Sequence, residues 1–150
     1  MAPASMVHAL QEIHDLLKPL DEAQGKADGL LIDIRPNGEL VEFIRPLEYG
    51  EHFIGYLQET DDYIEYRQAA AAVQEVVAAG LFRIKEVREF TFQTHADSFT
   101  ELKTFLDETW SDALITEDVI AEAERLDREF GAGKVIMRER VHIGLLKPIF

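Results

Sequence analysis

Apolar residues near the start of the chain recur with the spacing of an α-helix. Four of them fall on one side of such a helix, because positions three or four residues apart share a face: Met6, Leu10, Ile13 and Leu17. Ser5 is expected to cap this helix, and Pro19 cannot continue it. The polar segment Leu20–Asp28, which contains Gly25, is expected to form a mobile loop.

The next segments have the composition of β-strands. "GLLIDIRP" begins at Gly29, and its nearly continuous apolar run predicts a strand that is buried on both faces of its sheet. Two further runs, "ELVEFI" and "EHFIGYLQ", are separated by "RPLEYG", in which Pro46 and Gly50 predict a hairpin turn.

The remainder alternates helices and strands. Thr60 is expected to cap a helix that Gly80 ends, and a strand is expected over Phe82–Gln93. Ser98 with Glu101 forms a capping-box pattern, which predicts a short helix. Thr116 is expected to cap another helix, which Gly131 ends. The last expected strand is Lys134–Leu146. The expected order is helix, strand, hairpin, helix, strand, helix, helix, strand, which defines an α/β protein.

Composition narrows the possible functions. A chain of 150 residues with 47% apolar residues fits one folded domain. The net charge of -14 repels phosphate backbones and anionic membranes, so neither nucleic acid nor a membrane is expected as a partner. The absence of cysteine excludes disulfides and thiolate zinc sites. No apolar run is long enough to span a bilayer and no signal peptide is visible, so a cytoplasmic location is expected.

The element order, with "MVHALQEIHDLLKP...GLLIDIRP" first and "KVIMRERVHIGLLKP" last, resembles the C-terminal half of class I S-adenosylmethionine-dependent methyltransferases. By this resemblance, Met6–Pro19 is the helix before the fifth strand of that family's sheet, and Gly29–Arg35 is the fifth strand. Phe82–Gln93 and Lys134–Leu146 are the closing strands, the last antiparallel to its neighbours. The expected fold is a partial Rossmann-like sheet, equivalent to the last three strands, with an inserted hairpin and covering helices.

The elements by which the family binds its cofactor are missing from the sequence. These are a glycine-rich turn after the first strand and an acidic residue that ends the second. The only Gly-x-Gly, at Gly131–Gly133, follows a helix and enters a strand, which is the reverse of the order that a dinucleotide loop needs. No cofactor is therefore expected for this chain alone, and S-adenosylmethionine is expected only if the missing half is supplied.

Catalytic, cofactor-binding and metal-binding residues are not expected, but a substrate-side pocket is one interpretation of several polar and aromatic side chains. Arg35 and Asn37 follow the strand end at which ligands collect in α/β sheets. Four other residues could cover that site: Tyr49, His52, Tyr56 and Trp110. The alternative interpretation is that all six are ordinary turn, surface and packing residues.

Three functional hypotheses follow. In the first, the chain is a truncated methyltransferase-like domain that is not catalytic alone, and it forms a homodimer through the exposed edge near Gly29–Arg35. In the second, the chain is the C-terminal half of an active methyltransferase, and its N-terminal half is either missing from this sequence or supplied by a separate protein that binds the same edge. In the third, the hairpin and helices form a small-molecule binding module.

Overall fold

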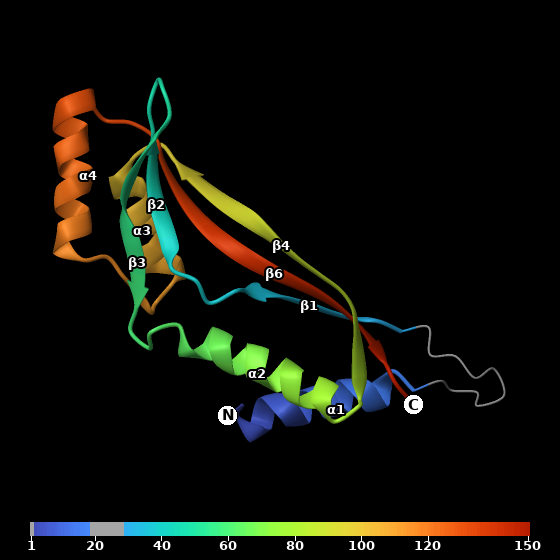
Figure 1. Ribbon diagram of the computed structural model, residues 1–150. Helices are drawn as coiled ribbons and strands as arrows, with labels where there is room; N and C mark the ends of the chain where they lie inside the picture. The colour runs from blue at the N-terminus through green and yellow to red at the C-terminus, as the bar shows by residue number, and fades with distance from the viewer. Residues whose placement is uncertain (1, 19–28) are drawn as a thin grey trace. The chain divides into compact units, whose positions relative to one another are not determined.

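The computed structural model describes residues 2–18 and 29–150 (Figure 1), so the segment Leu20–Asp28 expected as a loop lies outside the described residues. Within the described residues the chain is an α/β protein with four helices and an open, antiparallel sheet of six strands. The strand order is β1-β6-β2-β3-β5, and β4 also pairs with β6. The predicted order of elements is confirmed, with one short strand, β5, added.

The chain divides into two compact units. Of the described residues, the first unit comprises 2–18, 29–37, 64–90 and 141–150, and the second comprises 38–63 and 91–140. Strands β4 (Phe82–Ala96) and β6 (Val135–Pro148) contribute residues to both units.

Helices α1 (Ala4–Leu16) and α2 (Ile64–Ala78) belong to the first unit. Its core is formed by Val76, Phe82 and Leu146. Part-buried side chains of both helices pack against these three: Val7, Leu10, Ile13, Leu17, Val73 and Val77. The predicted apolar side of the first helix is therefore confirmed at its last three positions.

Two of the predicted helix caps are wrong. Pro3, in an extended conformation, is the N-cap of α1, and Ser5 lies inside the helix. Thr60 does not cap α2, which begins four residues later, because the chain first turns through two residues with positive φ, Asp62 (55°) and Tyr63 (61°). Gly80, with a φ of 78°, follows the end of α2 as predicted.

In the first unit, β6 pairs with both β1 (Leu31–Pro36) and β4. Strand β6 lies between β1 and β4, as Figure 1 shows. The pairing of β1 with β6 is antiparallel and aligns Leu31 with Leu146 and Pro36 with Val141. Strand β1 is therefore at the edge of the sheet, and β6 is its only strand partner among the described residues.

The prediction that β1 is buried on both faces is wrong. Ile32 and Ile34 are 58% and 62% exposed, whereas Leu31, Asp33 and Arg35 between and beside them are partly buried. Successive side chains of a strand point to opposite faces. One face of β1 is thus covered and the other, apolar face is open.

The second unit contains the predicted hairpin of β2 (Val41–Pro46) and β3 (Glu51–Glu59). Gly50 in the turn has a φ of 93°, which explains glycine at that position. The two-residue strand β5 (Ala113–Leu114) pairs with the end of β3. Residues 136–138 of β6 pair with β2.

Helices α3 (Phe99–Thr109) and α4 (Glu117–Phe130) complete the second unit. The predicted cap of α3 is confirmed, because the Ser98 hydroxyl accepts a hydrogen bond from the Glu101 N–H at 3.1 Å. Fully buried side chains from the hairpin and both helices form the core: Phe43, Leu57, Leu102, Leu106 and Leu126.

Over residues 2–18 and 29–150, no helix combines the length and the apolar character needed to cross a membrane.

Candidate functional site

The six residues predicted to line one pocket are divided between the two units. Arg35 and Asn37 belong to the first unit, and Tyr49, His52, Tyr56 and Trp110 belong to the second. Each group therefore has its own set of neighbours.

Arg35 belongs to a small polar cluster on the covered face of β1. Its Nε donates to Asp33 Oδ2 at 3.1 Å, and His142 Nε2 of β6 is 3.6 Å from the same oxygen. These side chains border a cavity of about 110 Å³ whose other walls are mainly apolar residues of α2 and β4. Ligand pockets for cofactor-sized molecules are typically about 300–1,000 Å³. The cluster is charge-compensated and too small to hold such a molecule.

Asn37 lies beyond the end of β1. Its side-chain amide is 3.5 Å from Glu89 Oε1 on β4 in an exposed contact. This contact joins a loop to a strand and does not add to the Arg35 cluster.

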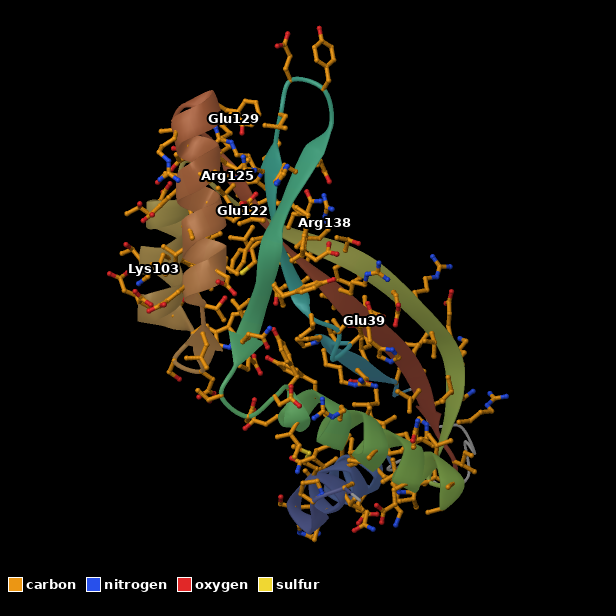
Figure 2. The ribbon with its side chains drawn as sticks, turned by 60° about the vertical axis from the view of Figure 1, so that its left-hand side comes forward. Glu39, Lys103, Glu122, Arg125, Glu129 and Arg138 are labelled. Carbon is orange, nitrogen blue, oxygen red and sulfur yellow. The ribbon has the colours of Figure 1, made fainter. Side chains whose placement is uncertain are left out.

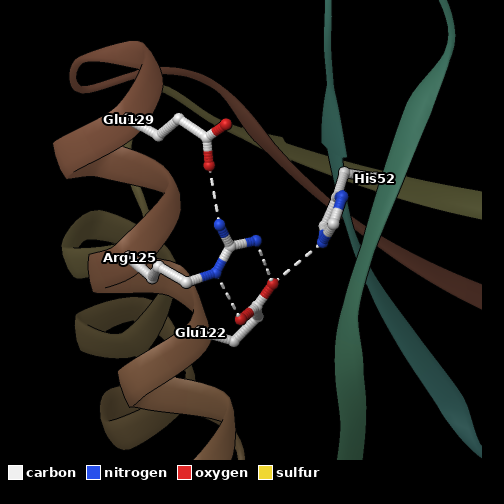
Figure 3. Close-up of polar contacts among 4 residues, drawn as sticks. All are labelled: His52, Glu122, Arg125 and Glu129. Atoms are coloured by element: carbon white, nitrogen blue, oxygen red, sulfur yellow. Dashed lines mark hydrogen bonds and ion pairs between the residues drawn. The ribbon is translucent and has the colours of Figure 1, made fainter.

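His52 contacts a charged network on α4 (Figure 3). Its Nε2 is 2.9 Å from Glu122 Oε1, and Arg125 binds both oxygens of Glu122 at 2.8 and 2.9 Å. Arg125 also donates to Glu129 at 2.6 Å. The bonds from Arg125, and then the bond from His52, lower the pKa of Glu122 to about 2. Glu122 is therefore a fixed carboxylate at neutral pH and cannot serve as a proton donor there.

A β-bulge separates His52 from Tyr56, although their spacing in an ideal strand would place them on the same face. The register shifts between Phe43 and Ile44, so that Ile54 of β3 has no direct partner on β2. His52 consequently shares the face of Gly55, which is directed toward Val119 of α4, whereas Tyr56 pairs with Glu42 on the other face. The two predicted pocket residues do not converge.

Tyr56 borders an open hollow of about 440 Å³ that is also lined by Arg138 and Arg140 of β6. Arg138 donates to Glu51 at 2.8 Å and Arg140 is 3.3 Å from Glu39. Arg138 and Glu39 are labelled in Figure 2. The bond from Arg138 lowers the pKa of Glu51. Both arginines are therefore already paired with carboxylates, which disfavours an anionic ligand in this hollow.

The last two predicted residues occupy turns. Tyr49 is 89% exposed on the hairpin turn and borders a second open hollow, of about 470 Å³, together with Phe130. Trp110 is the C-cap of α3, where its N–H donates to the Leu106 carbonyl at 2.8 Å. Their observed contacts agree with the turn and packing interpretation.

Three buried polar or charged residues were not predicted from the sequence: His14, Arg45 and Glu59. Arg45 of β2 is buried and bonds Asp127 of α4 and the carbonyl of Gly131. His14 of α1 is also buried, and its Nε2 donates to the Ile149 carbonyl at 2.7 Å. Neither Arg45 nor His14 belongs to a local sequence motif. The partners of Arg45 lie 82 and 86 positions away in the sequence, and Ile149 lies 135 positions from His14.

The most distinctive surface of the first unit is the open face and outer edge of β1, which we call the β1 surface. It carries Leu30, Ile32 and Ile34, with exposed fractions of 43%, 58% and 62%. The register places Ile32 opposite Leu145 and Ile34 opposite Ile143, so β6 extends the same apolar face. An open edge with apolar neighbours is a template for pairing with another chain.

Among residues 2–18 and 29–150, no three His, Asp or Glu side chains are grouped as metal ligands.

Comparisons of the chain with protein-family models, with curated proteins and with solved structures give no match.

Proposed function

We propose that this chain is a methyltransferase-like protein that does not transfer methyl groups by itself and acts as a self-associating scaffold. The observation that carries the proposal is the β1 surface, where a strand edge that has no strand partner among the described residues lies beside two exposed isoleucines. Such a surface is stable in water only if it stays small or acquires a partner.

The order of strands in the first unit supports the family resemblance. Strand β6, the last in the chain, lies between β1 and β4 and is antiparallel to β1. This is the arrangement that the resemblance implies for the closing strands of a methyltransferase sheet. Helix α1, which precedes β1 in the chain, packs on the core of this unit, as the helix before the fifth strand is expected to do.

The surroundings of the Gly-x-Gly segment support the absence of catalysis by the chain alone. Gly131 is the C-cap of α4, with a φ of 79°, and Gly133 faces the guanidinium of Arg45. A Cβ at Gly133 would lie 2.7 Å from Arg45 Nη2. The space that a glycine leaves beside its backbone is therefore filled here by the Arg45 side chain and not by a ligand. This glycine pair ends a helix and leads into a strand, so it does not form the strand-to-helix glycine turn by which the family binds S-adenosylmethionine.

The proposal is tested by recording the solution mass of the purified chain by light scattering at micromolar concentration and titrating the same sample calorimetrically with S-adenosylmethionine. A mass of two chains and no heat of binding are expected. A mass of one chain would refute self-association, and micromolar binding of the cofactor would refute the non-catalytic assignment.

A paired set of variants localises the association. Ile32→Lys with Ile34→Lys places two charges on the β1 surface without disturbing buried residues, because both side chains are more than half exposed. The double variant is expected to have the mass of one chain. Ile64→Lys, at a 43% exposed position on α2, is the matched control and should keep the mass of two chains.

The same surface favours a second candidate function, in which β1 accepts a strand from a separate polypeptide that supplies the cofactor-binding half of an active methyltransferase. This candidate predicts one chain in solution, and cofactor binding only after a polypeptide with a strand, a glycine-rich turn and an acidic strand end is added. A stable homodimer that blocks such addition would exclude it.

A further inference from the structure

The residues on β1 restrict how two copies can pair, if the self-association proposed above takes place through this edge. In an antiparallel pair, directly opposite residues lie on the same face of the sheet. A two-fold axis perpendicular to the sheet must then pass midway between one residue and its own copy. Four such axis positions pair at least three residues of β1 with those of the second copy: Ile32, Asp33, Ile34 and Arg35.

Charge separates these four registers. An axis at Asp33 or at Arg35 places two identical charges opposite each other. An axis at Ile32 places Asp33 opposite Leu31 of the second copy. Only an axis at Ile34 places Asp33 opposite Arg35 of the second copy, and it does so twice because the arrangement is symmetric.

The environment of the two charged residues makes this difference large. The side chains of Asp33 and Arg35 are 14% and 16% exposed, and they contact each other within the chain at 3.1 Å. Charges that are mostly removed from water are weakly screened, so opposed like charges cost more here than on an open surface. With the axis at Ile34, four charges of alternating sign surround the axis on the covered face.

On the open face, an axis at Asp33 would place Ile32 opposite Ile34 twice, so the charges on the covered face, and not the apolar contacts, select the axis at Ile34. The apolar contacts at this axis are nevertheless favourable. An axis at Ile34 brings the Ile34 side chains of the two copies into contact and places Ile32 opposite Pro36. Ile34, the more exposed of the two isoleucines, therefore gains an apolar partner. Pro36 has no N–H to donate, which ends the paired segment at that residue.

The net charge of the chain favours a contact between two copies that is made through a neutral segment such as residues 31–36. The whole chain carries a charge of -14, so two copies repel each other in general. Residues 31–36 contain one Asp and one Arg and are neutral as a group. We propose that two copies of this chain join their β1 strands antiparallel about a two-fold axis at Ile34, with Asp33 of each copy facing Arg35 of the other.

Single cysteines test the register directly, because the chain contains no cysteine. In the proposed pair, a cysteine at position 34 faces its own copy at a Cα separation of about 4.5–5.5 Å, which lies within the range of about 4.4–6.8 Å that a disulfide requires. Position 32 of one copy is about 13 Å from position 32 of the other, which is four strand residues away. Ile34→Cys is therefore expected to give a covalent dimer on mild oxidation, and Ile32→Cys, the matched control, is not.

The outcomes separate this register from self-association itself. A light-scattering dimer in which Ile34→Cys fails to cross-link, or in which Ile32→Cys cross-links as well or better, would overturn the register and leave self-association intact. A single-chain mass for the unmodified protein would overturn both.

Exchange of the two charges gives an independent measurement. Asp33→Arg alone places four positive charges around the axis, and the double variant with Arg35→Asp restores alternating charge. The dimer dissociation constant, measured by sedimentation, is expected to rise about tenfold or more in the single variant and to recover to within about threefold in the double variant. If the double variant remains as weak as the single one, the proposed facing of Asp33 and Arg35 is wrong. The cysteine experiment, which keeps both charges, remains decisive if a single charge variant does not fold.

Discussion

Arg45 of β2 donates through Nη1 to Asp127 Oδ1 of α4 at 2.6 Å, and its side chain is only 6% exposed. The same guanidinium donates to the carbonyl of Gly131, directly after the last turn of α4. One side chain thus joins the hairpin to the end of a helix and satisfies a carbonyl that the helix leaves free.

Replacement of Arg45 should therefore destabilise the second unit. Arg45→Met keeps most of the apolar stem but removes both bonds, and the free energy of unfolding is expected to fall by about 1–3 kcal/mol. Arg128→Met is the control, because Arg128 is exposed on the same helix and should change stability by no more than about 0.5 kcal/mol. Urea unfolding followed by circular dichroism measures both. Equal losses of unfolding free energy in the two variants would show that the bonds from Arg45 to α4 do not stabilise the second unit.

The Glu122 network should contribute to stability only above strongly acidic pH. The pKa of Glu122 is lowered in the folded chain from 4.5 to about 2, so its contribution is complete above pH 4.5 and is lost as the pH falls toward 2. Glu122→Gln removes this titrating group. The urea midpoint of the variant should be lower than that of the parent at pH 7, and the difference should shrink between pH 4.5 and 2. A difference that does not change with pH would contradict the assigned pKa.

Glu139 of β6 should have the opposite effect on stability. Burial raises the pKa of its carboxyl above 4.5, because the charged form loses hydration. The charged form therefore destabilises the fold once the pH rises through the folded pKa, and the cost is absent below pH 4.5. Glu139→Gln should raise the melting temperature at pH 7 and have little effect at pH 4. Glu124→Gln, at an exposed position on α4, serves as the control and should leave the melting temperature unchanged.

Gly55 should be required by the packing of α4 against β3. A Cβ at this position would lie 2.6 Å from Val119 Cγ2, which is closer than packed atoms tolerate. Gly55→Ala is expected to cost about 1–3 kcal/mol in unfolding free energy. Adding Val119→Ala removes the contacted methyl groups, so the double variant should lose less than the sum of the two single variants. Additive losses in this double-mutant cycle would show that the contact does not limit the helix position.

Local rules predicted the elements because their causes lie within a few residues. The spacing of Leu10, Ile13 and Leu17 predicts α1, and Ser98 with Glu101 predicts the start of α3. The predicted caps at Ser5 and Thr60 are wrong because the conformation of neighbouring residues decides where a helix starts. Helix α1 already starts after the extended Pro3, and the positive φ of Asp62 and Tyr63 delays the start of α2.

The predicted pocket shows where local reasoning ends. The spacing of His52 and Tyr56 would place both on one face of a regular strand, but the bulge at Ile54 reverses the face between them. The position of such a bulge is set by pairing with β2 and is not visible in β3 alone. Arg45 escaped prediction because its partners come from a helix more than 80 residues later in the chain.

The sequence by itself determined the α/β class, the order of the elements, the hairpin and the absence of a strand-to-helix glycine turn, because each depends on periodicity, turn residues or their spacing. The tertiary structure decided which of those elements are covered. The run Leu30–Ile34 predicts burial wherever it occurs, but burial also needs neighbours on both faces and at both edges. In the described part of the chain β1 has helices on one face and β6 at one edge, so Ile32 and Ile34 remain exposed.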